Sequence, residues 1–96
     1  MQLLSITKDS DGKHKMVATF KNTTTGRTKT VHFGAVGYED FTIHKDEERK
    51  KKYIARHKSR ETWADPTTAG SLSYFILWNK PTLKDSIADY KKRFKF

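Results

Sequence analysis

Alternating apolar and polar residues predict three β-strands in the first third of the chain. Two turn-like segments, DSDG (9–12) and NTTTG (22–26), divide this region into three runs, and Leu4 and Ile6 alternate with polar residues in the first. Residues two apart on a strand share one face of a sheet. The apolar residues of the second and third runs should therefore face the core: Met16, Ala18, Phe20, Val31 and Phe33. The expected strands pair antiparallel and lie at about residues 2–8, 13–22 and 27–34.

From residue 46 onward the apolar residues recur at helical spacing. Asp46 is a good N-cap, and the two glutamates after it suit the positive end of a helix dipole. Asp65 and Pro66 are typical of a second helix start, and Thr82 of a third. The expected helices lie at about residues 46–58, 66–78 and 83–94. Three strands followed by three helices predict an α+β fold in a single domain, residues 1–96, with the helices packed on one face of the sheet.

The chain is strongly basic, with 20 Lys and Arg residues, 11 Asp and Glu residues and a net charge of +9. Such an excess indicates a polyanionic partner, and nucleic acid is the first candidate. The absence of cysteine excludes disulfides and thiol catalysis. No apolar run approaches the length of a membrane span, and the N-terminus lacks the features of a signal peptide. We therefore expect an intracellular protein that is not secreted and has no membrane partner.

The densest positive charge lies in the segment 45–60, KDEERKKKYIARHKSR. On a helix, four of its bases follow at spacings of three and four and form one stripe: Arg49, Lys52, Arg56 and Arg60. At 1.5 Å per residue the stripe would extend about 16 Å, long enough to contact successive phosphates. Further candidate contacts come from the same segment and from the C-terminus: Lys45, Lys51, Lys58, Lys91 and Lys92. The alternative is a solvated face that carries charge only for solubility.

A glycine loop, Gly34 to Gly37, connects the last expected strand to the first expected helix. Two glycines three apart let the backbone approach a phosphate closely, as in clamp loops of RNA-binding folds. The alternative is a tight connection that needs positive φ. Beside the loop, Tyr38 and Phe41 could stack on bases or fill the corner between sheet and helices. Both tryptophans are expected in the core.

Catalytic and metal-binding patterns are missing from the sequence. The four histidines show neither HxxxH nor HExxH spacing. His44, with Glu39 and Asp40 nearby, lacks the convergent carboxylates that two-metal phosphate chemistry requires. The sequence therefore predicts no catalytic residue, no metal site and no cofactor.

Two strings, GAVGYEDFTIHKDEERKKKYIARHK (34–58) and WADPTTAGSLSYFILWNKPTLKDSIADYKKRF (63–94), carry a family resemblance. This part of the chain resembles a small uncharacterised domain family of large DNA viruses of algae and protists and of some of their hosts. The resemblance brings no established activity, cofactor or catalytic residue. It implies a viral origin and a role around a genome or a virion, in the host nucleus or cytoplasm or packaged in the virion.

Charge and resemblance favour a non-catalytic nucleic-acid-binding protein that contacts mainly the phosphate backbone, with DNA favoured over RNA. One alternative is a small structural protein of a virion or complex that docks on an acidic protein surface. An apolar helix left partly exposed at residues 72–78 would favour that alternative. The least favoured alternative is a small metal-dependent nuclease.

Overall fold

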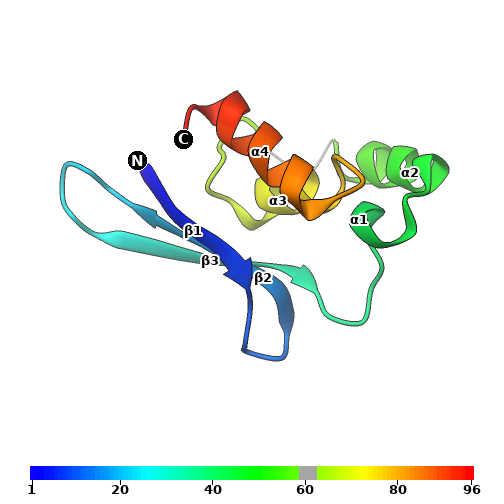
Figure 1. Ribbon diagram of the computed structural model, residues 1–96, viewed down its shortest axis with the longest axis horizontal. Helices are drawn as coiled ribbons and strands as arrows, with labels where there is room; N and C mark the ends of the chain where they lie inside the picture. The colour runs from blue at the N-terminus through cyan, green and yellow to red at the C-terminus, as the bar shows by residue number, and fades with distance from the viewer. Residues whose placement is uncertain (59–62) are drawn as a thin grey trace.

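In the computed structural model, which describes residues 1–58 and 63–96, a three-stranded antiparallel sheet is followed by helices (Figure 1). The sheet has the order β1-β2-β3, with strands Gln2–Lys8, His14–Lys21 and Thr28–Ala35. The helical elements are α1 (Phe41–His44), α2 (Glu47–His57), α3 (Ala69–Leu72), the π-helical η1 (Ser73–Leu77) and α4 (Leu83–Phe94). The predicted α+β fold is confirmed. Within the described ranges, no helix has the length and apolar character needed to cross a membrane.

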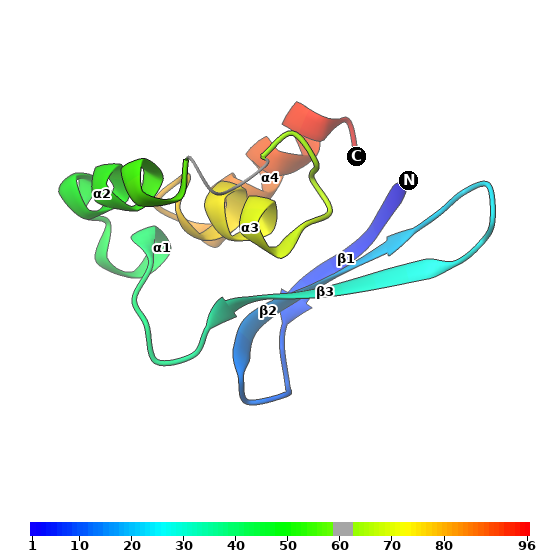
Figure 2. The ribbon, with the colours of Figure 1, turned by 180° about the vertical axis from the view of Figure 1, so that it is seen from behind.

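The core lies between one face of the sheet and the helices that cover it (Figures 1 and 2). Its buried residues come from β2, β3, α3, η1 and α4: Met16, Ala18, Phe20, Phe33, Leu72, Phe75, Ile76, Leu77 and Tyr90. Val31 is partly buried and packs against them. The alternation in the second and third strands therefore predicted the buried face correctly.

Strand β1 departs from simple alternation. The register with β2 shifts between Leu3 and Ser5, so Leu4 is an extra residue in a β-bulge. Leu3 and Ile6 pack against the core, whereas Leu4 is exposed. The bulge changes which residues share a face, so Leu4 and Ile6 do not lie side by side as the sequence pattern suggested.

The second predicted helix begins later than residue 66. The carboxylate of Asp65 accepts hydrogen bonds from the backbone N–H and hydroxyl of Thr67, at 2.9 and 2.8 Å, and closes a local turn. Thr68 is the N-cap instead, and its hydroxyl accepts from the N–H of Ser71 at 3.1 Å. The helix then continues from α3 directly into η1. The second helix therefore begins three residues later than predicted, because the turn that Asp65 closes does not continue as a helix and Thr68 supplies the cap.

Residues 41–58 form a wing beyond one end of the sheet, made of α1 and α2 (Figures 1 and 2). The single turn α1 was not predicted. Buried Asp40 caps it by accepting from the N–H of Thr42, and Lys45, at φ 53°, ends it. Asp46 caps α2 as predicted, accepting from two backbone N–H groups of the first turn. No residue of α2 is buried, so this helix docks on the protein without entering its core.

Candidate nucleic-acid interface

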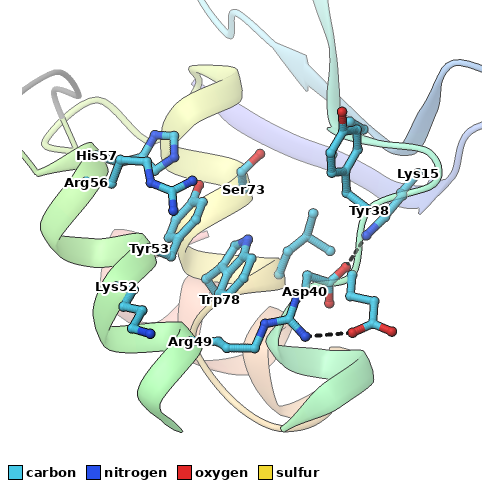
Figure 3. A pocket seen from close by; sticks show the side chains of 14 residues that line it. Lys15, Tyr38, Asp40, Arg49, Lys52, Tyr53, Arg56, His57, Ser73 and Trp78 are labelled. Carbon is cyan, nitrogen blue, oxygen red and sulfur yellow. Dashed lines mark hydrogen bonds and ion pairs between the residues drawn. The ribbon is translucent and has the colours of Figure 1, made fainter. Parts of the chain in front are cut away.

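A cleft of about 670 Å³ separates α2 from the end of the sheet (Figure 3). One wall is the basic side of α2, which contributes Arg49, Lys52, Tyr53, Arg56 and His57. The other wall comes from β2, the end of β3 and the following loop, with Lys15, Gly34, Ala35, Tyr38, Glu39 and Asp40. Ser73 and Trp78 lie between the two walls (Figure 3), and Leu77 also lines the cleft. The fold therefore places the basic helix and the glycine loop on opposite sides of one concavity.

An ion pair fixes the loop wall to the sheet. Lys15 Nζ donates to Asp40 Oδ2 at 2.7 Å, and the two side chains are 19% and 3% exposed. Asp40 also accepts from Thr42 at the start of α1. A carboxylate this well buried needs both partners to compensate for its lost hydration. Lys15 and Asp40 therefore hold the loop wall of the cleft in place, and because they are paired with each other, neither charge is available to a ligand.

A second ion pair joins the two walls. Arg49 Nη1 of α2 donates to Glu39 Oε2 of the loop at 2.8 Å, as the lower dashed line of Figure 3 shows. The two side chains are 48% and 56% exposed. Exposed pairs of this kind contribute about 0–1 kcal/mol. A ligand phosphate could therefore replace Glu39 beside Arg49 at little energetic cost.

The remaining charge of the cleft belongs to Lys52 and Arg56. The cleft is lined by four basic side chains and two carboxylates, a net charge of +2. Lys15 and Arg49 are paired with the carboxylates. Lys52 and Arg56 are exposed, and within residues 1–58 and 63–96 neither forms an ion pair. These two side chains are therefore the cations most available to an anionic ligand.

A column of stacked rings attaches α2 to the rest of the protein. Trp78 stacks on Tyr53 with ring centroids 4.3 Å apart and planes 4° apart, and Tyr53 stacks on His57 at 4.2 Å. His44 packs near the other end of the column, 5.3 Å from Trp78. Trp78 is thus half-buried at the margin of the core, and it also lines the cleft. The expectation that it lies within the core was only partly right.

Lys50 and Phe41 complete the attachment of α2. The ammonium group of Lys50 donates to the Asn79 carbonyl at 2.7 Å and lies 4.8 Å from the centroid of the Phe41 ring. Phe41 is buried against Lys50 and His44, whereas Tyr38 is 73% exposed at the cleft. Of the two aromatic residues beside the glycine loop, only Tyr38 can therefore stack on a base.

The structure brings together part of the predicted site: Gly34, Arg49, Lys52 and Arg56 line the cleft. Six other predicted residues do not line it: Gly37, Lys45, Lys51, Lys58, Lys91 and Lys92. At 100° per residue, Lys51 and Lys58 lie roughly 130–150° around α2 from the cleft stripe. Lys45 ends α1 and donates to the Thr42 carbonyl at 3.1 Å. Arg60 lies outside the described residues.

Gly34 is explained by its immediate neighbours. It has φ +78°, and an added Cβ would lie 2.7 Å from Leu77 Cδ1 and 3.3 Å from Lys15 Cβ. Glycine is therefore favoured by the positive φ, and an added Cβ would also force the Leu77 side chain to shift. Gly37, at φ +92°, has no atom within 4 Å of its added Cβ, so its backbone conformation alone favours glycine. Direct phosphate contact by either glycine stays a prediction.

Sequence reasoning overlooked a cluster near the β1–β2 turn, formed by Asp9, Asp11, His14 and His32. The Asp9 carboxylate is hydrogen-bonded to His32, which lowers the pKa of Asp9 and raises the pKa of His32. His32 is 23 residues from Asp9 in sequence. No motif search within one element could therefore have found it. The earlier candidates Glu39, Asp40 and His44 do not form such a cluster, because Arg49 and Lys15 engage the two carboxylates.

Comparisons with known proteins give a family but no function. No curated protein and no solved structure matches the chain. The expectation of an uncharacterised domain family is confirmed, although the matched range begins nearer the N-terminus than the resemblance over residues 34–94. Residues 4–57, more than half of the 96, match the model described as "Family of unknown function (DUF5754)", and the chain belongs to that family.

Proposed function

We propose that this protein binds nucleic acid without catalysis, and that it holds a single strand in the cleft beside α2. The observation that carries the proposal is the position of Lys52 and Arg56. Both line a concave site, and neither forms an ion pair within the described part of the chain. Phosphates of the strand would bind to these two side chains.

The shape of the site favours a single strand over a duplex. Its volume of about 670 Å³ is within the usual range of pockets that take small ligands. Single-strand binders combine a basic groove with aromatic rings on which bases stack. Tyr38 lines the cleft from the loop side and is 73% exposed, so it supplies such a ring. A duplex would present its phosphates on a convex surface and would contact mainly the outer side of α2.

DNA as the nucleic acid and a viral genome or virion as the setting form the finer part of the proposal. Both derive from the resemblance of residues 34–94 to a family of large DNA viruses. They imply an intracellular protein, in the host nucleus or cytoplasm or packaged in the virion. The matched family model spans β1 to α2, which supply most of the cleft, so the proposed site would be a family feature.

The test is fluorescence anisotropy of the full chain with labelled single-stranded DNA, RNA of the same sequence and duplex DNA, each across a salt series. We expect the single strands to bind more tightly than the duplex. Binding should weaken as salt rises, with a log–log slope of about −0.7 per phosphate contacted. The double variant Lys52→Ala/Arg56→Ala should reduce the magnitude of that slope by about 1.4.

The matched control is Lys51→Ala/Lys58→Ala, which removes the same charge from the opposite side of α2. It should reduce the slope by less than the cleft variant does. Equal effects of the two double variants would show that net charge, and not the cleft, determines binding. Absence of binding at low salt would contradict the proposal altogether.

A second candidate function is docking on an acidic protein surface. Three large apolar side chains are exposed in the loop after β3 and in α1, Val36, Tyr38 and Ile43, at 51%, 73% and 56%, and Tyr38 also lines the cleft. Such side chains beside a basic helix suit a protein interface. The apolar segment 72–78 adds no support, because Phe75, Ile76 and Leu77 are buried. A stable complex with an acidic protein, lost in Ile43→Ser and unaffected by competing single-stranded DNA, would favour this function over the first.

A further inference from the structure

The turn between β1 and β2 brings four potential metal ligands together on the sheet. Asp9 and Asp11 come from the turn, His14 begins β2, and His32 lies in β3. One ligand atom from each residue can be chosen so that all four lie within 4.8 Å of one another. The rings of His14 and His32 have centroids 5.5 Å apart. Residues from both sides of the turn and from a third strand therefore converge on one point.

The backbone of the turn already orients both carboxylates. Asp9 Oδ1 accepts from the N–H of Asp11 at 3.0 Å. Asp11 Oδ1 accepts from the N–H groups of Lys13 and His14, at 2.7 and 2.9 Å. In each carboxylate, Oδ2 is left to face a histidine Nδ1. Hydrogen bonds that fix the free oxygen of a ligand in this way are typical supports of metal sites.

The two histidines are held by the sheet. His32 lies between Val31 and Phe33, which pack against or within the core, so its own side chain projects from the opposite face. Its Nδ1 contacts Asp9 Oδ2 and is 3.7 Å from Asp11 Oδ2. His14 Nδ1 is 2.9 Å from Asp11 Oδ2. The Asp9 side chain is only 4% exposed, and its hydrogen bonds with the His32 ring and the Asp11 N–H compensate for its lost hydration.

We propose that Asp9, Asp11, His14 and His32 bind one Zn²⁺ ion. Zinc bonds imidazole nitrogen and carboxylate oxygen at about 2.0–2.2 Å, which places neighbouring ligand atoms about 3.4 Å apart in a tetrahedron. The chosen ligand atoms already lie within 4.8 Å of one another, and a bound ion would draw them into that geometry. Two imidazoles favour zinc over magnesium or calcium, which prefer oxygen ligands alone.

Four protein ligands fill a tetrahedron and leave no open position. The site is therefore structural, because catalytic zinc keeps a position for water or substrate. The ion would tie the β1–β2 turn to β3, whose end supplies Gly34 and Ala35 to the cleft. Without an ion, the same four side chains form two Asp–His pairs that stabilise the turn.

The test is calorimetric titration of the full, chelator-treated chain with Zn²⁺, and optical spectroscopy with Co²⁺ as a reporter of tetrahedral coordination. We expect one ion per chain, a tetrahedral Co²⁺ spectrum and a higher melting temperature with Zn²⁺ than without. Asp11→Asn retains the carbonyl oxygen that accepts the turn hydrogen bonds and removes one ligand. It should weaken Zn²⁺ binding by at least about tenfold, since loss of a mere supporting group often costs 10–100-fold.

His32→Gln should have the same effect from the third strand. The control is Asp85→Asn, which removes an exposed carboxylate from the first turn of α4 and should leave Zn²⁺ binding unchanged. If Zn²⁺ does not bind in the micromolar range, the proposal is wrong and the four side chains form only two Asp–His pairs. If wild type and both ligand variants bind Zn²⁺ equally well, the ion binds elsewhere on the protein and the proposal is also wrong.

Discussion

The covered sheet and the wing of residues 41–58 are built on different principles. In the sheet and the helices that cover it, Phe20, Phe33 and Tyr90 are at most 1% exposed and belong to one hydrophobic core. In the wing, α2 has no buried residue and depends on a column of stacked rings and on Lys50. At 11 residues α2 is shorter than the ~12–15 residues at which isolated helices become marginally stable. The core therefore stabilises the domain, and a few contacts hold the charged helix beside it.

This difference explains where the candidate site lies. A helix buried in the core must use its side chains for packing, whereas α2 keeps Lys52 and Arg56 in solvent. The cleft lies where the wing stands beside the sheet, and the contacts that join the wing to the rest of the protein include the Trp78 column, the Lys50–Asn79 hydrogen bond and the Arg49–Glu39 pair. Substitutions in the two halves should consequently have different effects.

The largest effect is expected for Phe33→Ala in the core. The ring is 1% exposed, and removing it should lower the free energy of unfolding by about 3–5 kcal/mol. Urea denaturation followed by circular dichroism measures this loss. The control Phe33→Leu keeps most of the volume and should cost less than about 1.5 kcal/mol. A loss below about 1 kcal/mol in Phe33→Ala would contradict the assignment of the core.

A smaller and local effect is expected for Trp78→Ala. The half-buried indole stacks on Tyr53, and its removal should cost about 2 kcal/mol, since full burial would be worth 3–5. Hydrogen exchange should show faster opening of α2, with much smaller changes in β2 and β3. Trp78→Phe keeps an aromatic face and should restore part of the protection. Uniform acceleration across both halves would show that the wing is not a separate unit.

The smallest effect is expected for Asp46→Ala. Its carboxylate accepts from the N–H groups of Glu48 and Arg49 at 3.0 and 3.3 Å. Loss of this N-cap should cost about 1 kcal/mol and reduce the helical signal of α2. Asp46→Asn keeps a capping oxygen and should cost less. If both variants unfold the whole domain at the same denaturant concentration as wild type, and α2 keeps its exchange protection, the cap does not hold the wing.

The fold was predictable where one local interaction dominates. Period-two alternation identified the buried face of β2 and β3, and Asp46 and Thr82 marked two helix starts. Prediction failed where two local options compete. At Leu4 a bulge inserts an extra residue into β1, and at Asp65 the side chain closes a turn where the first helical turn was predicted.

The candidate site was predictable only in part. The stripe Arg49, Lys52 and Arg56 follows from helical spacing, and the structure places all three in the cleft. The spacing did not show that Arg49 is paired with Glu39 or that Trp78 forms part of the same cleft. From composition alone, Lys51 and Lys58 were as good candidates for phosphate contacts as Lys52 and Arg56, although they lie on the other side of α2.

The sequence by itself determined the α+β class, the buried faces of two strands and the concentration of positive charge before residue 60. Each of these properties depends on residues that are close together in the sequence, so the spacing of apolar and charged residues along the chain is enough to predict it. Only the tertiary structure decided which charges remain unpaired, which aromatic rings line a cleft and which four ligands meet near the β1–β2 turn. Those outcomes depend on contacts between different elements, such as Arg49 with Glu39 and His32 with Asp9, which are 10 and 23 positions apart, and such contacts arise from the packing of the chain.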